Sequence, residues 1–494
     1  AFVASCDVLG VVVVVVYVGD AAAKGFVGGG GGYRGGDGGV GSDVATGGDS
    51  FVDTSTHSGT VNSAAAGADG GGTERAGEVT ITCVSGLSDD PVVTTATDEQ
   101  DDSCVDGDCS LRDAVAVATA GSTITFAAGL SGSTSTLSLG QFVLSKDVTL
   151  DATALADGFT LDADGDSRLF EVPVGVTAAL RGLTLTGGSA DDGGAVLNAG
   201  TLTLDGVLVS GNTASSFGGG LNNSGALTLV NTTVSGNTGN TGGGLYNSGT
   251  ATLAGATFSG NGASLSGHQL FNIASGTLHL VSSVFAGTQA SGAQCVSSGT
   301  IATNRYVFVQ GTHSCGTAGG GSPVGFLTGD PKLGALADNG PTWTHLPQAL
   351  SPLLDAGTCD TDAVTGVDLT TDQRGEARAV DLADGTYPDA SDGCDIGAVE
   401  AQDAAVGITA NPVVTTATDE LDRSCSDGDC SLRDAAFVAT VGSTITFSAG
   451  LSGGTLTLTL GQLALSKDVT LDATALAGGF ALDADGDSRR FDVD

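Results

Sequence analysis

Apolar and polar residues alternate along much of the chain, and the alternation itself repeats. The sequence reads TLTLDGVLVSGNTASSFGGGLNNSG from Thr201 and ALTLVNTTVSGNTGNTGGGLYNSG from Ala226, and a third copy begins at Thr250. Each copy predicts an alternating strand, a turn, a second strand, a Gly-rich corner and a third short strand. A period of about 25 residues built from such strands is typical of one coil of a β-solenoid. We therefore predict an all-β fold, a right-handed parallel β-helix.

One polar position recurs in all three copies. Asn212, Asn237 and Asn261 occupy equivalent places after the second strand. Asn tolerates left-handed backbone, and stacked amides can hydrogen bond along a solenoid axis. An asparagine ladder is therefore expected at this corner.

A longer duplication divides the chain. PVVTTATDEQDDSCVDGDCSLRDA begins at Pro91, PVVTTATDELDRSCSDGDCSLRDA begins at Pro412, and the two copies stay aligned as far as Arg168 and Arg489. We predict a complete β-helix unit over residues 91–401, with a closing module at 351–401, and the start of a second, truncated unit over 411–494. Residues 1–90 form a Gly/Val-rich segment unlike either unit.

A short helix is expected before each solenoid. SLRDAVAVATA follows Cys109, and its Ser110 with Asp113 three residues later resembles a capping box, with Ser110 as the N-cap. A helix here would cover the first coil, whose strand edges are otherwise open.

Composition narrows the class of protein. Among 494 residues there are 81 Gly, no Met and only 5% aromatic residues, which suits narrow β-coils with Gly at the corners. The formal net charge of −40 argues against nucleic-acid binding, because phosphate backbones would be repelled. The longest apolar run, residues 8–18, is too short to span a bilayer. The absence of Met, with Ala1 at the start, fits a mature protein that has lost a signal peptide.

The ten cysteines predict disulfides and an extracellular or cell-surface location. Cysteines in four close pairs flank or bracket loops, and the two that remain could pair with each other. The expected pairs are Cys104 with Cys109, Cys425 with Cys430, Cys295 with Cys315, Cys359 with Cys394, and Cys6 with Cys83.

The valine run Val11, Val12, Val13, Val14, Val15 and Val16 has a very high β-propensity and would aggregate if exposed. It is expected to be buried, either within its own chain or as a strand added to a neighbour. Because the second unit stops in mid-solenoid, residues 1–90 of one subunit could complete the open end of the next. Such a head-to-tail contact would build a homopolymer.

Candidate ligand and modification sites are few. Asp162, Asp164 and Asp166, with Asp483, Asp485 and Asp487 in the second copy, place hard oxygen ligands at alternate positions, which would suit Ca²⁺. A solvated turn is the alternative, because the pattern lacks the EF-hand glutamate. Asn222 and Asn231 lie in N-x-S/T sequons and are candidate glycosylation sites.

Catalysis is not expected, although β-helices can carry polysaccharide lyases and hydrolases. Asp191 and Asp192 are the best carboxylate pair, and no basic residue is demonstrably close to them in the sequence. Trp343 and His345 are expected to pack in a core or cap. Arg374 and Glu376 are expected to stabilise a loop by a salt bridge.

Three motifs carry a family resemblance that covers residues 91–494. CSLRDA resembles the CSLREA motif of secreted bacterial β-helix proteins, with Asp113 and Asp434 in place of Glu. GGGLYNSG and VSGNT resemble polymorphic outer-membrane repeats. Residues 351–400 resemble the closing module of such surface proteins, with DIGAVE for a DIGAYE-like end. The resemblance implies a secreted or surface-displayed right-handed β-helix and no particular enzyme activity.

The features together predict a structural extracellular protein that self-assembles head-to-tail into a filament or sheath. The alternatives are a surface adhesin or stalk within a longer repeat array, to which glycans could bind, and a polysaccharide-active lyase or hydrolase. Electron microscopy, with and without a calcium chelator, separates these readings.

Overall fold

The computed structural model describes residues 2–6, 11–15, 88–105, 107–287, 292–316, 323–348, 351–361, 366, 368–378, 393–401, 409–420, 425, 429–460, 462–465, 468–484 and 491–493. The chain divides into two compact units, residues 1–87 and 88–494. In the first unit, β1 (Phe2–Cys6) and β2 (Val11–Val15) pair as an antiparallel sheet. Most of the valine run therefore pairs within its own chain, and Val16 lies outside the described residues.

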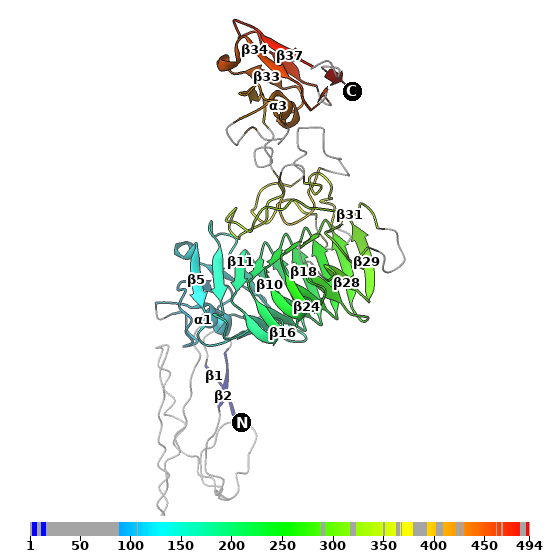
Figure 1. Cartoon of the computed structure of the whole chain (residues 1–494). Helices are drawn as coiled ribbons and strands as arrows, with labels where there is room; N and C mark the ends of the chain where they lie inside the picture. The colour runs from blue at the N-terminus through cyan, green and yellow to red at the C-terminus, as the bar shows by residue number, and fades with distance from the viewer. Residues whose placement is uncertain are drawn as a thin grey trace, which may run out of the picture. The chain divides into compact units, whose positions relative to one another are not determined.

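The alternating repeats fold into a right-handed parallel β-solenoid, as predicted (Figure 1). Each coil contributes one strand to each of three long sheets, and the strands of a sheet pair in parallel with those one coil away. The first sheet contains β3 (Val92–Val93), β4 (Ser122–Phe126), β7 (Val148–Asp151), β10 (Thr177–Arg181), β14 (Thr201–Asp205), β18 (Ala226–Val230), β22 (Thr250–Ala254), β26 (Thr277–Val281) and β29 (Thr300–Arg305).

The other sheets follow the same order along the axis. The second sheet contains β5 (Ser133–Thr136), β8 (Phe159–Asp162), β11 (Leu183–Thr186), β15 (Leu208–Ser210), β19 (Thr233–Ser235), β23 (Thr257–Ser259), β27 (Val284–Ala286), β30 (Phe308–Val309) and β31 (Leu327–Thr328). The third contains β6 (Phe142–Val143), β9 (Phe170–Val172), β13 (Val196–Asn198), β17 (Leu221–Asn223), β21 (Leu245–Asn247), β25 (Leu270–Asn272) and β28 (Cys295–Ser297). The fourth is shorter and contains β12 (Ser189–Asp192), β16 (Thr213–Phe217), β20 (Thr238–Thr241) and β24 (Gly262–Ser266).

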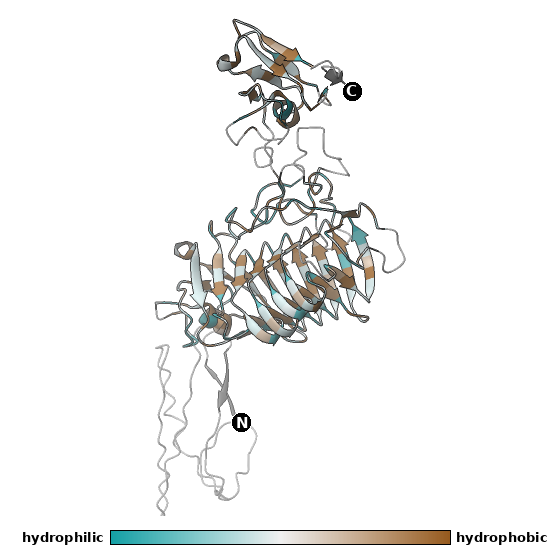
Figure 2. Cartoon of the chain, in the orientation of Figure 1, coloured by the Kyte–Doolittle hydropathy of each residue, from teal (hydrophilic) through white to brown (hydrophobic). Residues whose placement is uncertain are grey.

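The alternation decides which side chains form the core. Leu202 pairs in register with Leu227, and Leu204 pairs with Leu229, and all four are at most 2% exposed. Figure 2 shows these apolar positions as bands that recur from strand to strand. Because every coil adds the same inward residues, one continuous core cluster runs the length of the solenoid.

The Gly-rich corner before the third sheet requires glycine. Gly218 has φ +67°, and a Cβ at this position would lie 2.1 Å from the carbonyl oxygen of Leu221. Both the left-handed backbone and the missing space exclude other residues. The GGGL motif is therefore a corner of the solenoid.

The second copy of the repeat folds in the same way as the start of the first. Helix α3 (Leu432–Val438) corresponds to α1 (Leu111–Val117), and the 3₁₀ helices η2 (Ala128–Leu130) and η3 (Ala449–Leu451) also correspond. Its strands are β32 (Val413–Val414), β33 (Thr444–Phe447), β34 (Gly454–Thr457), β35 (Leu463–Leu465), β36 (Thr470–Asp472), β37 (Phe480–Asp483) and β38 (Phe491–Val493). The copy has a hydrophobic core cluster of its own.

Candidate functional site

The CSLRDA motif builds a cap at the first coil. Ser110 is the N-cap of α1: its hydroxyl accepts from the amide of Asp113 at 3.1 Å, and the Asp113 carboxylate accepts from the amide of Ser110 at 3.3 Å. This capping box confirms the predicted helix start. Leu111 and Ala114 are buried in the core cluster of the solenoid, so the helix closes that end (Figure 1).

Arginine in the same motif ties the helix to the next turn of chain. Arg112 donates to Asp98 at 2.7 and 3.1 Å and to the carbonyl oxygen of Gly140 at 2.6 Å, and it lies 4.3 Å above the ring of Phe142. Asp98 also accepts from the amide of Leu139 at 2.8 Å. Burial raises the pKa of Asp98, but the hydrogen bonds and charge of Arg112 and the backbone amides outweigh it and leave that pKa below its ordinary value. We call the Asp98–Arg112 pair the entry clamp.

The second copy repeats this clamp. Arg433 donates to Asp419 at 2.8 and 3.1 Å, and Asp419 accepts from the amide of Leu460 at 2.7 Å. Ser431 is the N-cap of α3. In both copies, residues of the CSLRDA motif thus hold the cap.

Two ladders of buried amides run along the axis. The predicted ladder is confirmed: Asn212 donates to Asn237, and Asn237 to Asn261, each at 2.9 Å. Sequence reasoning missed a second ladder, in which each amide nitrogen donates to the next residue at 2.7 to 3.0 Å; its members are Asn198, Asn223, Asn247, Asn272 and Ser297. Its signal was present in the repeats, as Asn223 and Asn247 each directly precede an SG pair.

The second ladder begins at Asn198. Asn198 Oδ1 is buried without a hydrogen-bond partner, because the preceding coil offers Val172 at the paired position. In such a ladder each amide oxygen accepts from the amide of the preceding coil, so the oxygen of the first member has no amide partner.

The largest feature that sequence reasoning missed is where the chain returns after the last coil. The described residues within 329–401 lie against the outer face of the second sheet and the turns that lead into it. Their contacts extend from Gly206, whose carbonyl accepts from Thr342 at 3.1 Å, to Ser282, whose hydroxyl donates to the carbonyl of Thr358 at 2.8 Å. The apolar part of this contact packs Leu353 and other residues against Val284. We call the described residues within 329–401 the closing flank; they belong to the predicted closing module and to a segment before it.

Three buried polar side chains on the second sheet have partners in the closing flank. Thr233 donates to the side-chain oxygen of Gln373 at 2.6 Å, and the hydroxyl of Ser235 lies 2.9 Å from Nε2 of His345. The hydroxyl of Thr257 accepts from a backbone amide at 2.9 Å. A polar group that is buried must be paired to avoid a desolvation cost, and these groups are paired.

A buried charge cluster anchors the closing flank. Arg378 lies 3.5 Å from Glu400 with both side chains fully buried, and it donates to Asn231 at 2.9 Å. Burial raises the pKa of Asp395 well above its ordinary value, and the neighbouring Glu400 carboxylate adds to this rise. Burial also lowers the pKa of Arg378, against the opposing charge of Glu400.

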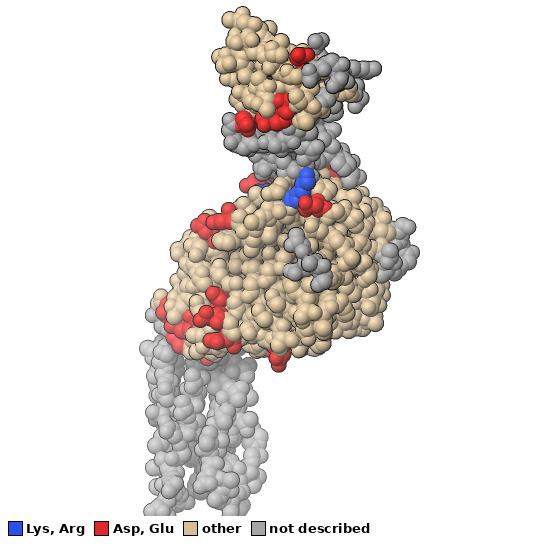
Figure 3. All heavy atoms as spheres, in the orientation of Figure 1, with Lys and Arg blue, Asp and Glu red and all other residues tan. Residues whose placement is uncertain are grey.

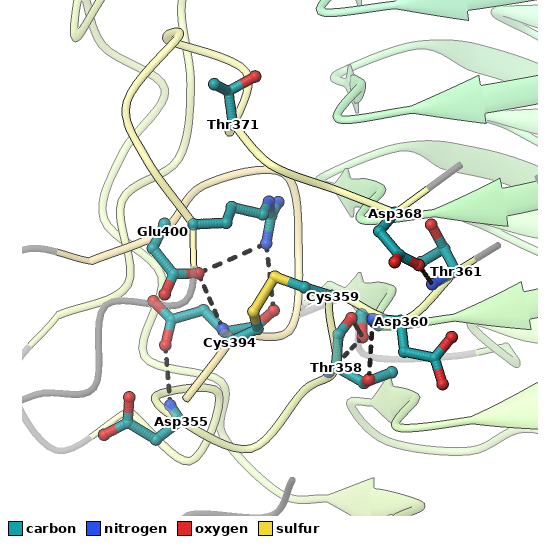
Figure 4. The surroundings of a disulfide bond; sticks show 12 residues. Asp355, Thr358, Cys359, Asp360, Thr361, Asp368, Thr371, Cys394 and Glu400 are labelled. Atoms are coloured by element: carbon teal, nitrogen blue, oxygen red, sulfur yellow. Dashed lines mark hydrogen bonds and ion pairs between the residues drawn. A yellow bond between two sulfur atoms is a disulfide. The ribbon is translucent and has the colours of Figure 1, made fainter. Parts of the chain in front are cut away.

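The structure contains most of the predicted disulfides. Four of the expected pairs are present: Cys104–Cys109, Cys295–Cys315, Cys359–Cys394 and Cys425–Cys430. Cys359–Cys394 lies within the closing flank beside the charge cluster (Figure 4), and it packs with Leu369 against Val230 of the first sheet. The fifth pair involves Cys83, which lies outside the described residues.

The aspartates considered for calcium form a turn. Asp162 accepts from the backbone amide of Asp164 at 2.9 Å, and Asp164 has φ +51°. Within the described part of the chain, no three His, Cys, Asp or Glu side chains come together as metal ligands. Asp485 and Asp487 lie outside the described residues, and calcium binding stays a prediction.

Both sequon asparagines are largely buried. Asn231 is 5% exposed, and its side-chain nitrogen donates to the carbonyl of Thr371 at 2.7 Å. Asn222 is 9% exposed. In the folded chain neither amide is presented to solvent as a glycan acceptor, because the closing flank covers Asn231 and Asn222 lies within the third sheet.

Other expected residues take structural places. His345 is buried as predicted, whereas Trp343 is 51% exposed, so its predicted packing is wrong. Arg374 forms its salt bridge with Asp372 at 2.8 Å and not with Glu376, whose backbone amide donates to the same Asp372.

The carboxylate pair considered for catalysis holds neighbouring coils together. Asp191 accepts from the hydroxyl of Ser215 at 2.7 Å, and Asp192 accepts from the amide of Phe217 at 3.2 Å. In the view of Figure 3 most of the solenoid surface carries neither acidic nor basic side chains.

Two hollows on the described surface are open to solvent. One, of about 560 Å³, lies between residues 95–98 and the edge of β5, and another, of about 280 Å³, lies within the closing flank near Asn339. No helix in the described part of the chain is long and apolar enough to cross a membrane.

Comparison with known proteins returns no match: no family model fits the chain, and no curated protein or solved structure is significantly similar to it. The parallel solenoid is therefore established by the structure. The finer resemblance to CSLREA-motif surface proteins rests on the motifs alone.

Proposed function

We propose that this protein is a structural protein of the cell exterior, in which capped solenoid units act as rigid spacers in a surface stalk of the CSLREA-motif type. The observation that carries the proposal is the repeated entry clamp. Asp98–Arg112 and Asp419–Arg433 use the same residues at the same distances, and each holds a helix over the start of a solenoid. Units with covered entry ends can be joined in series without fusing through their strand edges.

Three further features support a load-bearing role outside the cytoplasm. Four disulfides fit an oxidising compartment. The closing flank ties coils from Gly206 to Ser282 to one another along the axis. The two described hollows are open to solvent, whereas enzymes and small-ligand proteins bind in clefts that bury most of the ligand.

Electron microscopy of the full chain tests the proposal. We expect separate short rods whose length does not change with protein concentration. Filaments that lengthen with concentration would favour the head-to-tail homopolymer instead, and their fraying on addition of a chelator would bring in calcium. Cleavage of a polysaccharide panel by the same preparation would overturn the structural assignment, and binding without cleavage would place the stalk among adhesins.

A further inference from the structure

The contact between β19 and the closing flank sets a hydroxyl nucleophile against an acyl carbon. Thr233 Oγ1 donates to Gln373 Oε1 at 2.6 Å, and the two residues are 0% and 5% exposed. Because a C=O bond is about 1.23 Å long, the Gln373 side-chain carbonyl carbon lies no more than about 3.8 Å from Thr233 Oγ1. Reactive pairs in near-attack geometry are about 3–3.5 Å apart. A small shift is enough to bring these two atoms into that range.

The amide group of Gln373 is held in place by further contacts. Its Nε2 donates to the hydroxyl of Thr342 at 2.9 Å, and that hydroxyl donates to the carbonyl of Gly206 at 3.1 Å. The backbone amide of Gln373 donates to the carbonyl of Ala398 at 2.9 Å. The acyl group is thus fixed against Thr233 in a site that excludes bulk water, which limits hydrolysis of an ester formed there.

A neutral imidazole lies in the same interface. His345 Nδ1 is 2.8 Å from the carbonyl oxygen of Gly334, which can only accept, so Nδ1 carries the proton and Nε2 is the basic nitrogen. Nε2 lies 2.9 Å from the hydroxyl of Ser235, two residues along the same strand as Thr233. Burial lowers the pKa of His345, which keeps the imidazole neutral at physiological pH.

We propose that Thr233 and Gln373 form an intramolecular ester that joins the solenoid covalently to its closing flank. The Thr233 oxygen attacks the side-chain carbonyl carbon of Gln373, and the new C–O bond replaces the bond from that carbon to Nε2. The hydroxyl proton passes to the leaving nitrogen, and ammonia departs, so nothing is oxidised or reduced.

Mass spectrometry of the full chain tests the ester directly. We expect the reduced, denatured protein to weigh less than its sequence by one ammonia. A protease digest should contain a branched peptide that joins the segment of Thr233 to the segment of Gln373, and hydroxylamine should cleave it. Thr233→Val and Gln373→Leu should each abolish the branched peptide completely.

Thr257→Val is the matched control. Thr257 pairs in register with Thr233 one coil further on and is also buried, but its hydroxyl accepts from the backbone amide of Ala398 and faces no side-chain acyl group in that bond. This variant should keep the full ammonia loss.

The unaltered chain decides the proposal even if a variant fails to fold. A folded chain with the full sequence mass overturns it. So does an ammonia loss without a branched peptide, as cyclisation at the Asn339–Gly340 pair would give.

Discussion

The first and second sheets present the same kinds of residue on their outer faces, but these residues are buried to different extents. On the first sheet Thr201 is exposed and Thr203 is half-buried. On the second sheet Thr233 and Thr257 are at most 2% exposed, and Ser235 is 6% exposed. The difference is the closing flank, which covers these three positions of the second sheet and supplies their hydroxyls with partners. A polar outward position in a solenoid therefore has little energetic weight until a distant segment buries it.

The arginine on the covered face is buried and the one on the open face is exposed. The largest expected loss of stability follows from this difference. Replacing Arg378 with Leu leaves Glu400 buried without its counterion, and we expect a loss of about 3–5 kcal/mol in the free energy of unfolding. Arg181→Leu is the control: it removes a 45% exposed arginine that lies 3.9–4.0 Å from Asp205 and Asp151 on the first sheet, and should cost at most about 1 kcal/mol. Urea denaturation measures both variants. Equal losses would mean that the covered face is no more sensitive than the open one.

Removing the disulfide of the closing flank should weaken the covered face next most strongly. We expect Cys359→Ser with Cys394→Ser to lower the free energy of unfolding by about 2–4 kcal/mol and to make the closing flank sensitive to proteases. The Cys104–Cys109 bridge spans 5 residues instead of 35, so its removal should cost less because it closes a shorter loop. A larger loss at Cys104–Cys109 would contradict this order.

Acid should affect the stability of the entry clamp and of the closing flank in opposite directions. The folded pKa of Asp98 lies below its ordinary value of 3.8, so the clamp adds stability above that value and loses it as the pH falls through the folded pKa. Asp395 has a raised pKa, so the folded closing flank binds its proton more tightly and gains relative stability as the pH falls towards 3.8.

Hydrogen exchange at decreasing pH measures this contrast, and Asp98→Asn should remove the acid sensitivity of α1. Burial lowers the pKa of His345 below its ordinary value of 6.5, so the neutral imidazole adds stability above that value and begins to lose it as the pH falls below it. Loss of protection in the closing flank before α1 below pH 3.8 would contradict the assignment of the pKa directions.

The smallest expected effect compares single hydroxyls on the two faces. Ser235→Ala leaves the buried Nε2 of His345 without its partner and should cost about 1–2 kcal/mol. Thr203→Ala on the open sheet should stay within about 0.5 kcal/mol. Thermal unfolding of the two variants side by side checks the difference, and similar midpoints would show that the cover adds nothing at this position.

Local pattern was sufficient to predict the solenoid, the cap and one ladder. The alternation in TLTLDGVLV places Leu202 and Leu204 inward whatever else the chain does, because the side-chain period of a strand is two. Ser110 and Asp113 are three residues apart, and the helix start they form needs no distant partner. The cysteine pairs were also predictable, since four of the five are close in the sequence.

Only the tertiary structure decided which outward faces are covered. Nothing near NTTVS in the sequence distinguishes Thr233 from Thr228, because the partner of Thr233 is Gln373, 140 residues further along the chain. For the same reason Asn231 reads as a sequon but lies beneath Arg378, and Trp343 reads as a core residue but faces solvent. Strand periodicity acts between neighbours and is written in the sequence, whereas burial of an outer face depends on where a remote segment returns.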